Sequence, residues 1–298
     1  MSASAYHQHT VSGPVIFAGV GVHSGAHVRV VVRPAPVDAG IVFVRTDIKH
    51  GDNAIRVSPD AVNQTRLGTV IANAAGASVS TIEHLMAALC GLAIDNAVVE
   101  LDGPEVPILD GSAEPFVQVL DRAGRRRQEA PRRFIEVLEP VEVIDGDKRA
   151  ALLPCEDFEV AFEIAFDSAA VGRQRVDIQV TEESFRSELA DSRTFGFLKD
   201  VEALRAAGLA RGASMENAVV LDGDRVLNPE GLRRADEFVR HKAQDAVGDL
   251  YVLGAPLLAR FEGLYAGHAL NNLLVRALMA RPEAWRVRVL APAFAQAV

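Results

Sequence analysis

The sequence has few cysteines, no long apolar run and no excess of basic residues. Its two cysteines, Cys90 and Cys155, lie far apart and form no CxxC motif. Two isolated cysteines suit a reducing compartment and exclude a disulfide-stapled scaffold. No run reaches the roughly 18 apolar residues of a transmembrane helix, so we predict no transmembrane segment. No lysine or arginine precedes the apolar stretch 11–22, which argues against a secretory signal, and we expect a cytoplasmic protein.

The charge balance is acidic. The chain has 31 Lys and Arg residues against 40 Asp and Glu residues, which gives a formal net charge of −9. A general nucleic-acid binder is normally basic, so we expect no nucleic-acid partner. Hydrophobic residues make up 49% and charged residues 24% of the 298 residues. These values are typical of a globular protein with one large domain or two smaller ones.

Hydrophobic patterns divide the chain into two similar halves. In the first half, strands are predicted at 27–33, 41–45, 69–73 and 96–101 and helices at 80–92 and 112–124. In the second half, strands are predicted at 134–144, 158–166, 174–180, 217–221, 256–261 and 286–290 and helices at 181–190, 198–207, 236–253 and 269–280. Strands followed by helices, twice, favour an α+β fold with domains 1–128 and 129–298 over a doubly wound sheet.

The basic stretch 122–133 lies at this predicted boundary. It contains three consecutive arginines that begin at Arg125, followed by Arg132 and Arg133. Because a run of like charges is usually solvated, an interdomain linker is the preferred interpretation. A patch that binds an anion is the alternative.

The segment 240–250, with the sequence RHKAQDAVGDL, has the most informative spacing. On a helix, His241, Asp245 and Asp249 are separated by four residues each and share one face. A polar stripe among apolar neighbours is costly to bury unless something pairs with it. A His and an Asp on one face can bind the same divalent metal ion. A solvent-facing stripe with a His–Asp hydrogen bond is the alternative.

A second helix offers the ligand that such a metal site still needs. Catalytic zinc usually has three protein ligands and keeps one position open. Within STIEHLMAAL at 80–89, His84 is a candidate third ligand and Glu83 a candidate general base. Ser80 and Glu83 also fit a capping box, which explains the glutamate but not the histidine. The HExxH signature of zincins is absent from the sequence.

Two further segments carry candidate site residues. His268 is a candidate general acid whose second ring nitrogen is held by a carboxylate such as Asp249. A capping or surface histidine is the alternative there. In the segment 192–197, the hydroxyl of Thr194 lies between a basic residue and two aromatic residues. A turn with core aromatic residues is the alternative for this segment.

The stretch 17–25 contains three glycines and is a weak candidate for a phosphate-binding loop. Its glycines do not have the GxGxxG spacing, so a tight turn is the default interpretation. His23, within this stretch, has no role that the sequence assigns.

Six segments together resemble the zinc-dependent UDP-3-O-acyl-N-acetylglucosamine deacetylase family of lipid A biosynthesis. The matching motifs are GVGVHSG at 19–25, STIEHLMAAL at 80–89, PEVPILDGSAEPF at 104–116, SRTFGF at 192–197, FVRHKAQDAVGDL at 238–250 and GHALNN at 267–272. They occur in the family's order and extend over nearly the whole chain. The resemblance implies a metal-dependent amidohydrolase that removes the N-acetyl group of UDP-3-O-(3-hydroxyacyl)-N-acetylglucosamine as acetate, an early committed step of lipid A biosynthesis.

The resemblance also implies roles for the residues that match the family motifs. The zinc ligands correspond to three residues: His84, His241 and Asp245. Two His and one Asp suit iron(II) as well as zinc, so both ions stay open. Glu83 matches the general base, and His268 matches the general acid that Asp249 orients.

Other matches concern the substrate. Thr194 matches a hydroxyl that polarises the substrate carbonyl, and Lys242 matches a basic residue near the scissile amide and the diphosphate. The remaining expected substrate contacts are Val22, Lys148, Phe166, Phe195 and Phe197. The segment from Thr194 to about residue 220 matches the insert that forms an apolar passage for the acyl chain. At the nucleotide end the chain departs from the family, because Tyr265 replaces a basic residue and 167–171 replaces a His-Pro pair.

The family fold consists of two related α+β domains, each a β-sheet layered with a helix pair, with the active site between the helix layers. The expected partner is the acylated UDP-sugar, and we expect a monomer. The preferred acyl length and a transient contact with the membrane surface stay open.

Two other functions stay open at the level of the residues alone. A metal phosphohydrolase with a His–Asp helix normally has an adjacent His-Asp dipeptide, which this sequence lacks. A catalytically inactive protein that binds sugar nucleotides would tolerate the loss of Glu83 or His268, and both residues are present.

Overall fold

The computed structural model describes residues 6–290, which form an α+β fold with two main sheets. The first sheet has the strand order β2(Val15–Val20), β3(His27–Pro34), β9(Ala97–Leu101), β4(Ile41–Arg45) and β5(Ala54–Arg56). The second sheet has seven strands: β12(Val141–Asp145), β13(Lys148–Pro154), β19(Leu257–Leu264), β11(Arg133–Val137) and β20(Trp285–Val289) in order, with β14(Phe158–Ala165) next to β19 and β15(Arg173–Gln179) at the edge beyond β14. The predicted α+β class is confirmed.

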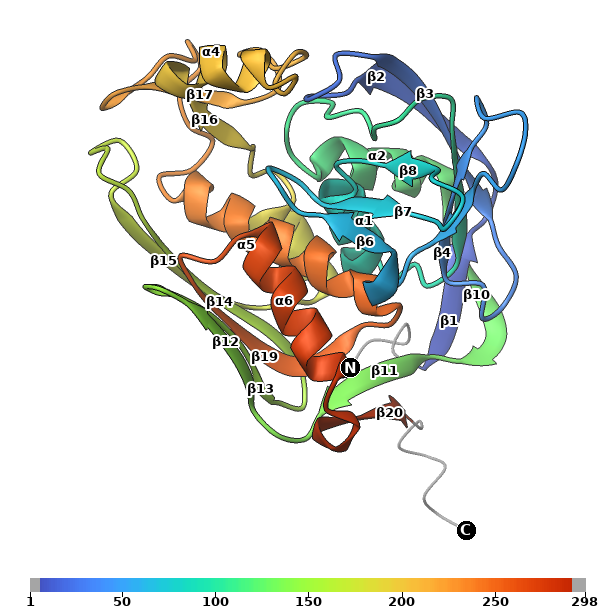
Figure 1. Cartoon of the computed structure of the whole chain (residues 1–298). Coiled ribbons are helices and arrows are strands. Elements are labelled where there is room, and N and C mark those ends of the chain that lie inside the picture. The colour runs from blue at the N-terminus through green and yellow to red at the C-terminus, as the bar shows by residue number, and fades with distance from the viewer. Residues whose placement is uncertain (1–5, 291–298) are drawn as a thin grey trace.

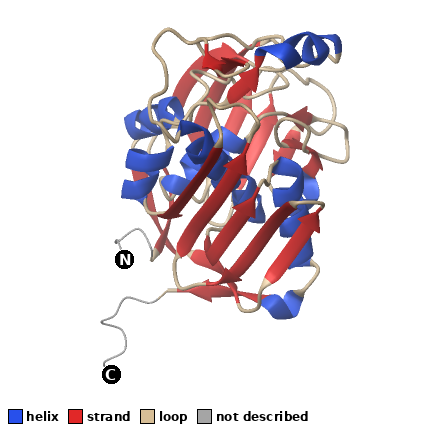
Figure 2. Cartoon of the chain, turned by 90° about the vertical axis from the view of Figure 1, so that its left-hand side faces the viewer, coloured by secondary structure: helices blue, strands red, loops and turns tan. Residues whose placement is uncertain are grey.

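Four helices lie between the two sheets, as Figure 1 shows. They are α1(Glu83–Gly91), α2(Glu114–Ala123), α5(Glu237–Leu250) and α6(His268–Met279). α1 packs against α5 and α2, and α2 also contacts β2. α5 contacts β14 and β15, and α6 contacts β12 and β13. Viewed from the side of the second sheet, the long strands lie in front of these helices (Figure 2). A domain boundary at residue 128 stays a prediction.

Three smaller sheets complete the structure. The first consists of β6(Val62–Gln64), β7(Val70–Ala72) and β8(Ser78–Val79), and the second pairs β1(His7–Val11) with β10(Arg125–Pro131). The third consists of β16(Phe195–Phe197), β17(Val219–Asp222) and β18(Arg225–Val226), and it lies with α4(Leu198–Ala206) at the top of Figure 1. A three-residue α3(Glu182–Ser184) precedes a short π-helical turn at Phe185–Leu189. No helix among the described residues is long and apolar enough to cross a membrane.

The elements follow from the burial of their side chains. β9 alternates buried and half-buried residues along its length, as a strand with one face on the core does. α5 is buried on nearly all sides, because it packs between other helices and the second sheet. After α5 a short 3-10 turn ends at Gly254, whose φ of 83° lies in the left-handed region that favours glycine.

Two predicted segments need correction. The basic stretch at the expected boundary is exposed at its three consecutive arginines, as expected, but it is not an irregular linker, because most of it forms β10 and pairs with β1. Arg132, directly after β10, is buried and donates to Asp95 Oδ1 over 2.7 Å. The single strand predicted at 134–144 is two strands, β11 and β12, which are separated by a break that contains Pro140. Proline cannot donate to a strand ladder, so the interruption is expected at that residue.

Candidate active site

One face of α5 carries the three polar residues whose spacing stood out in the sequence. His241, Asp245 and Asp249 are each at most 3% exposed. They lie within a single helix of 14 residues, so the separation of four residues brings their side chains onto one face. That face is turned toward α1 and α6 rather than toward solvent, because α5 contacts both helices. The alternative of a solvent-facing stripe is therefore wrong.

His84, from the first turn of α1, completes a compact cluster with two of these residues. One ligand atom each of His84, His241 and Asp245 lies within 4.8 Å of the others, and all three side chains are buried. His84 Nε2 lies 3.4 Å from Asp245 Oδ1, and His241 Nε2 lies 3.4 Å from Asp245 Oδ2. We call these three residues the His–His–Asp cluster. Tetrahedral ligands about 2.0–2.1 Å from a zinc ion are separated by roughly 3.3–3.4 Å, so the spacing fits such an ion.

The hydrogen bonding around the cluster also suits a cation. His241 Nδ1 bonds to the carbonyl oxygen of Ser192 over 3.1 Å, which leaves Nε2 to face Asp245. Metal-binding histidines commonly use the second ring nitrogen in this way. Asp245 Oδ1 is buried and has no hydrogen-bond partner among the described residues. Burial lowers the pKa of His241 to about 3, so its ring is neutral and able to offer a lone pair.

Glu83 lies beside the cluster and is almost fully buried. Its Oε2 accepts a hydrogen bond from the backbone N–H of Thr69 over 2.9 Å. Its Oε1 lies 3.9 Å from His268 Nε2. Burial raises the pKa of Glu83, although the nearby His268 and His84 oppose the shift. The helix-capping alternative is not supported, because α1 begins at Glu83 itself and its N-cap is Ile82, which makes no side-chain capping bond.

His268 is held at the start of α6 by Asp249. Its Nδ1 lies 2.8 Å from Asp249 Oδ2, and its Nε2 points toward Glu83 and lies 3.8 Å from Asp245 Oδ2. Asp249 Oδ2 also accepts from Asn271 Nδ2 over 2.9 Å. Burial disfavours the charged ring, but the charges of Asp249 and Glu83 outweigh burial and raise the pKa of His268 to about 9.

Two residues that hold this arrangement were missed in the sequence. Thr69 binds Glu83 through its N–H, and its hydroxyl donates to Asp249 Oδ1 over 2.6 Å. No local pattern marks Thr69, because it is far from both partners in the chain. Asn271 follows His268 by three residues on α6, a spacing that places both residues on one helix face. The spacing alone could therefore have indicated Asn271 as a partner of the His268 site.

Lys242 and a group of aromatic rings lie next to the cluster. Lys242 Nζ donates to Asp245 Oδ2 over 2.8 Å and lies 5.9 Å from the ring centre of Phe195. Burial opposes the charge of Lys242, but Asp245 holds its pKa above the usual value. The ring centre of Phe195 is 5.6 Å from that of Phe166, which in turn is 5.9 Å from that of Phe197. The structure thus brings these three predicted aromatic residues together.

The other predicted substrate contacts, Thr194, Val22 and Lys148, come from three separate segments of the chain. Thr194 is half-buried and accepts, through its carbonyl, from the N–H of Val219. Its chain neighbours on both sides lie near His241: Ser192 bonds to the ring through its carbonyl oxygen, and the ring centre of Phe195 is 6.3 Å from that of His241. Val22 is buried in the glycine-rich loop. Lys148 is exposed at the start of β13, beside the end of β19 that leads to His268. The substrate roles of these residues stay predictions.

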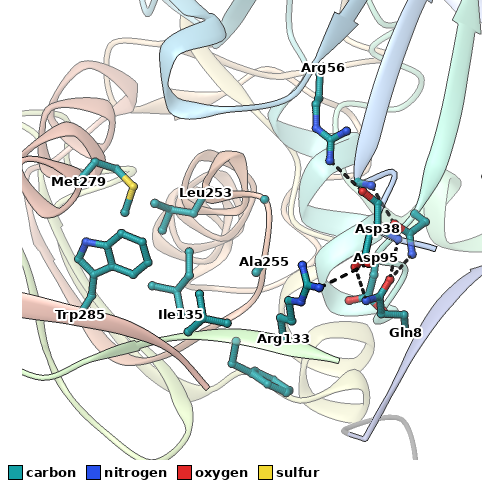
Figure 3. A pocket seen from close by; sticks show the side chains of 15 residues that line it. Gln8, Asp38, Arg56, Asp95, Arg133, Ile135, Leu253, Ala255, Met279 and Trp285 are labelled. Carbon is teal, nitrogen blue, oxygen red and sulfur yellow. Dashed lines mark hydrogen bonds and ion pairs between the residues drawn. The ribbon is translucent and has the colours of Figure 1, made fainter. Parts of the chain in front are cut away.

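A separate hollow lies near the C-terminal end of α5. It has a volume of about 250 Å³, and its wall combines polar residues such as Arg56, Asp38 and Arg133 with apolar residues such as Leu253 and Trp285 (Figure 3). The two arginines are already bonded to Asp38. None of the candidate site residues lines this hollow, so it is distinct from the His–His–Asp cluster.

The fold and the site together define a class of protein. A buried His–His–Asp cluster, next to a buried glutamate and a histidine held by a carboxylate, has the layout of a hydrolytic centre that works with a divalent metal. The family model for UDP-3-O-acyl N-acetylglycosamine deacetylase matches residues 8–280 of this chain. The chain therefore belongs to the UDP-3-O-acyl-N-acetylglucosamine deacetylase family.

Individual relatives agree with the family model. The UDP-3-O-acyl-N-acetylglucosamine deacetylase of Phenylobacterium zucineum is 72% identical over 98% of this chain and 99% of its own length. The proteins of the same name from a Shewanella species and from Acidithiobacillus ferrooxidans are each 51% identical, over 94% and 93% of this chain. Matches of this extent cover both halves of the chain and every segment that contributes to the site.

Proposed function

We propose that this chain hydrolyses the N-acetyl amide of UDP-3-O-(3-hydroxyacyl)-N-acetylglucosamine and releases acetate and a free amine. We further propose that it acts in the cytoplasm as a monomer. The observation that carries the proposal is the meeting of α1, α5 and α6 at one buried point, with the His–His–Asp cluster flanked by Glu83 and His268. The names of the relatives specify the substrate class.

A divalent metal ion is the cofactor that these residues fit. His84, His241 and Asp245 would hold it, since their spacing and the unpartnered Asp245 Oδ1 suit a tetrahedral ion. When bound, such an ion lowers the pKa of water and polarises a carbonyl oxygen. We propose zinc as the resident ion, and iron(II) has the same ligand preference for two His and one Asp.

Glu83 is suited to remove a proton from the attacking water. Its Oε2 is fixed by the Thr69 N–H, so Oε1 is the oxygen that remains toward the cluster. A raised pKa makes a carboxylate a stronger base, and burial supplies that rise here. A base positioned in this way typically contributes about 10²–10⁴-fold to the rate.

His268 is suited to protonate the departing amine. Asp249 binds Nδ1, so Nε2 is the nitrogen that faces the reaction space. The neighbouring carboxylates keep the ring protonated near neutral pH. Lys242 and the Thr194 hydroxyl would stabilise the negative charge that develops on the carbonyl oxygen, and one such donor contributes about 3–4 kcal/mol.

The remaining predicted contacts serve the two ends of the substrate. Phe166, Phe195 and Phe197 form a continuous apolar surface next to the cluster, which suits an acyl chain or a sugar face. Each CH₂ buried there contributes about 0.8 kcal/mol, part of which can position the amide. Lys148 is a candidate for the diphosphate or nucleotide end, because it is exposed and cationic.

Acetate release and metal content together test the proposal. The wild type should release one acetate per amine and bind a divalent metal, whereas His241→Ala should lose both. Glu83→Gln keeps the shape of the side chain and all three ligands, so it should keep the metal and lose activity by about 10²-fold or more. Release of phosphate or a nucleoside monophosphate from the same substrate would instead indicate a phosphohydrolase. Stoichiometric metal in His241→Ala would refute the assigned ligands.

A further inference from the structure

The glycine-rich loop at residues 19–25 surrounds a carboxylate of the same chain. Glu105 is fully buried. Its Oε1 accepts from the backbone N–H of His23 over 2.9 Å, and its Oε2 accepts from the backbone N–H of Ser24 over 2.7 Å. A Cβ at Gly21 would overlap this carboxylate, so the position requires glycine. The loop therefore binds an internal anion, and the phosphate-loop candidate from the sequence is wrong.

The same carboxylate reaches the turn that begins α1. The hydroxyl of Thr81 donates to Glu105 Oε1 over 2.8 Å. Thr81 has a φ of 57°, which is strained for a β-branched residue. It precedes Glu83 by two residues and His84 by three. A strained turn persists only where its surroundings hold it, and the bond to Glu105 is one such restraint.

The opposite side of the glycine-rich loop contacts the insert, which extends from Thr194 to about residue 220. The carbonyl oxygens of Val22 and His23 accept from the N–H groups of Gly212 (3.1 Å) and Arg211 (3.2 Å). The His23 ring continues the contact, since its Nδ1 accepts from the N–H of Ala210 over 3.4 Å. Its Nε2 is then free to donate to the carbonyl oxygen of Leu67 over 3.0 Å. One ring tautomer satisfies both bonds, so His23 links the insert to the loop that leads to Thr69.

We propose that Glu105 is a positioning residue that couples the acyl-chain insert to the helix carrying Glu83 and His84. The inference rests on the proposed function. With Glu105 in place, the loop that holds residues 210–212 and the turn at Thr81 share one buried anchor. A substrate whose long acyl chain is seated in the insert then has its N-acetyl amide at a set distance from the general base. Without the anchor the acyl chain still binds in the insert, but the amide is displaced from the general base.

The variant Glu105→Gln tests this coupling. It keeps the size of the side chain but turns an NH₂ group toward one of the three donors that Glu105 accepts from, which are the N–H groups of His23 and Ser24 and the hydroxyl of Thr81. A buried charge-assisted bond is involved, so kcat/KM for a substrate with about 14 acyl carbons should fall roughly 10- to 100-fold. A two-carbon acyl analogue does not reach the insert, and its kcat/KM should fall less than about threefold. The long-to-short ratio should therefore drop, while metal content stays that of the wild type.

Two further variants separate positioning from general destabilisation. Ser24→Ala keeps the N–H that Glu105 accepts, so its long-to-short ratio should match the wild type. His23→Ala removes the ring bonds to Leu67 and Ala210 at a half-buried position, so it should lower the ratio without loss of folding.

The outcomes are distinct. An equal fractional loss on both substrates in Glu105→Gln, or a wild-type ratio in that variant, overturns the coupling. If Glu105→Gln does not fold, His23→Ala decides, and an unchanged ratio there overturns it. A wild type that releases acetate from neither substrate refutes the proposed function instead.

Discussion

Gly248 sets how closely helices α1 and α5 approach each other. A Cβ at this position would overlap the carbonyl oxygen of Glu83 and would lie 2.8 Å from its carbonyl carbon and 3.0 Å from the backbone nitrogen of Ala87. Carbon atoms are in ordinary contact only from about 3.5 Å, so Gly248→Ala must separate the two backbones by roughly 0.7 Å or more. The two helices carry the whole His–His–Asp cluster, and the separation therefore moves its members apart.

Metal sites tolerate ligand displacements of only about 0.2 Å, so we expect Gly248→Ala to bind metal at least tenfold more weakly. A displacement approaching 1 Å between catalytic groups typically costs about 10²-fold in rate, and kcat/KM should fall by that order. The free energy of unfolding should fall by about 1–3 kcal/mol from overpacking. This loss should appear even though alanine stabilises a helix interior by about 0.5–1 kcal/mol relative to glycine.

Metal retention under graded chelator, deacetylation kinetics and urea unfolding measure the three effects. Gly13→Ala is the matched control, because a Cβ there meets no atom within 4 Å and the residue is not in the left-handed region. The control should behave as the wild type in all three assays. Wild-type metal affinity and kcat/KM in Gly248→Ala would show that the helix spacing does not set the site geometry, and the reasoning would be refuted.

Other expected outcomes follow from the same structure. Gly91→Ala should destabilise the fold by about 1–3 kcal/mol in urea unfolding, because its Cβ would overlap the buried ring of Phe185. Burial and two nearby arginines lower the pKa of His9 from 6.5 to about 4. As the pH is lowered, the unfolded chain therefore takes up this proton before the folded chain does. The free energy of unfolding should fall as the pH drops from about 6.5 to about 4, and it should fall less steeply in His9→Gln. Chelation should abolish deacetylation, and added zinc should restore it; activity that survives full metal removal would contradict the proposed cofactor. Shortening the acyl chain stepwise should lower kcat/KM, and a flat series would contradict an apolar passage.

Local periodicity accounts for the part of the site that lies on one helix. The separation of four residues between His241, Asp245 and Asp249 required only that the segment be helical, and α5 is helical throughout it. His84 is different, because it lies on another helix far away in the chain. Nothing in the local pattern of either helix indicates that α1 and α5 approach each other at Gly248. The family motifs suggested the meeting, and only the three-dimensional structure shows it.

The fold shows the same division between local and distant causes. β3 is rich in valine and β14 alternates apolar and polar residues, so both carry a strand signal in their own sequence and were predicted. β10 was not predicted, because Gln128 is its single buried residue and three arginines precede it. Its existence depends on pairing with β1 and on a buried amide contact, in which Asn96 donates to Gln128 over 2.8 Å. A strand made by such partners leaves no periodic signal in its own sequence.

The charges buried at the centre explain why these particular groups occur together. Glu83, Asp245 and Asp249 would carry three negative charges, and Lys242 with a protonated His268 would carry two positive ones, which leaves one negative charge in a water-poor site. Uncompensated buried charge is costly. A divalent cation reverses the sum to one positive charge, which is the complement of a single negative charge developing on a substrate oxygen. Stabilisation that appears only as that charge develops lowers the energy of the transition state relative to the bound amide, and so it accelerates the reaction. A neutral centre would stabilise the uncharged amide as well as the transition state and would give no such acceleration.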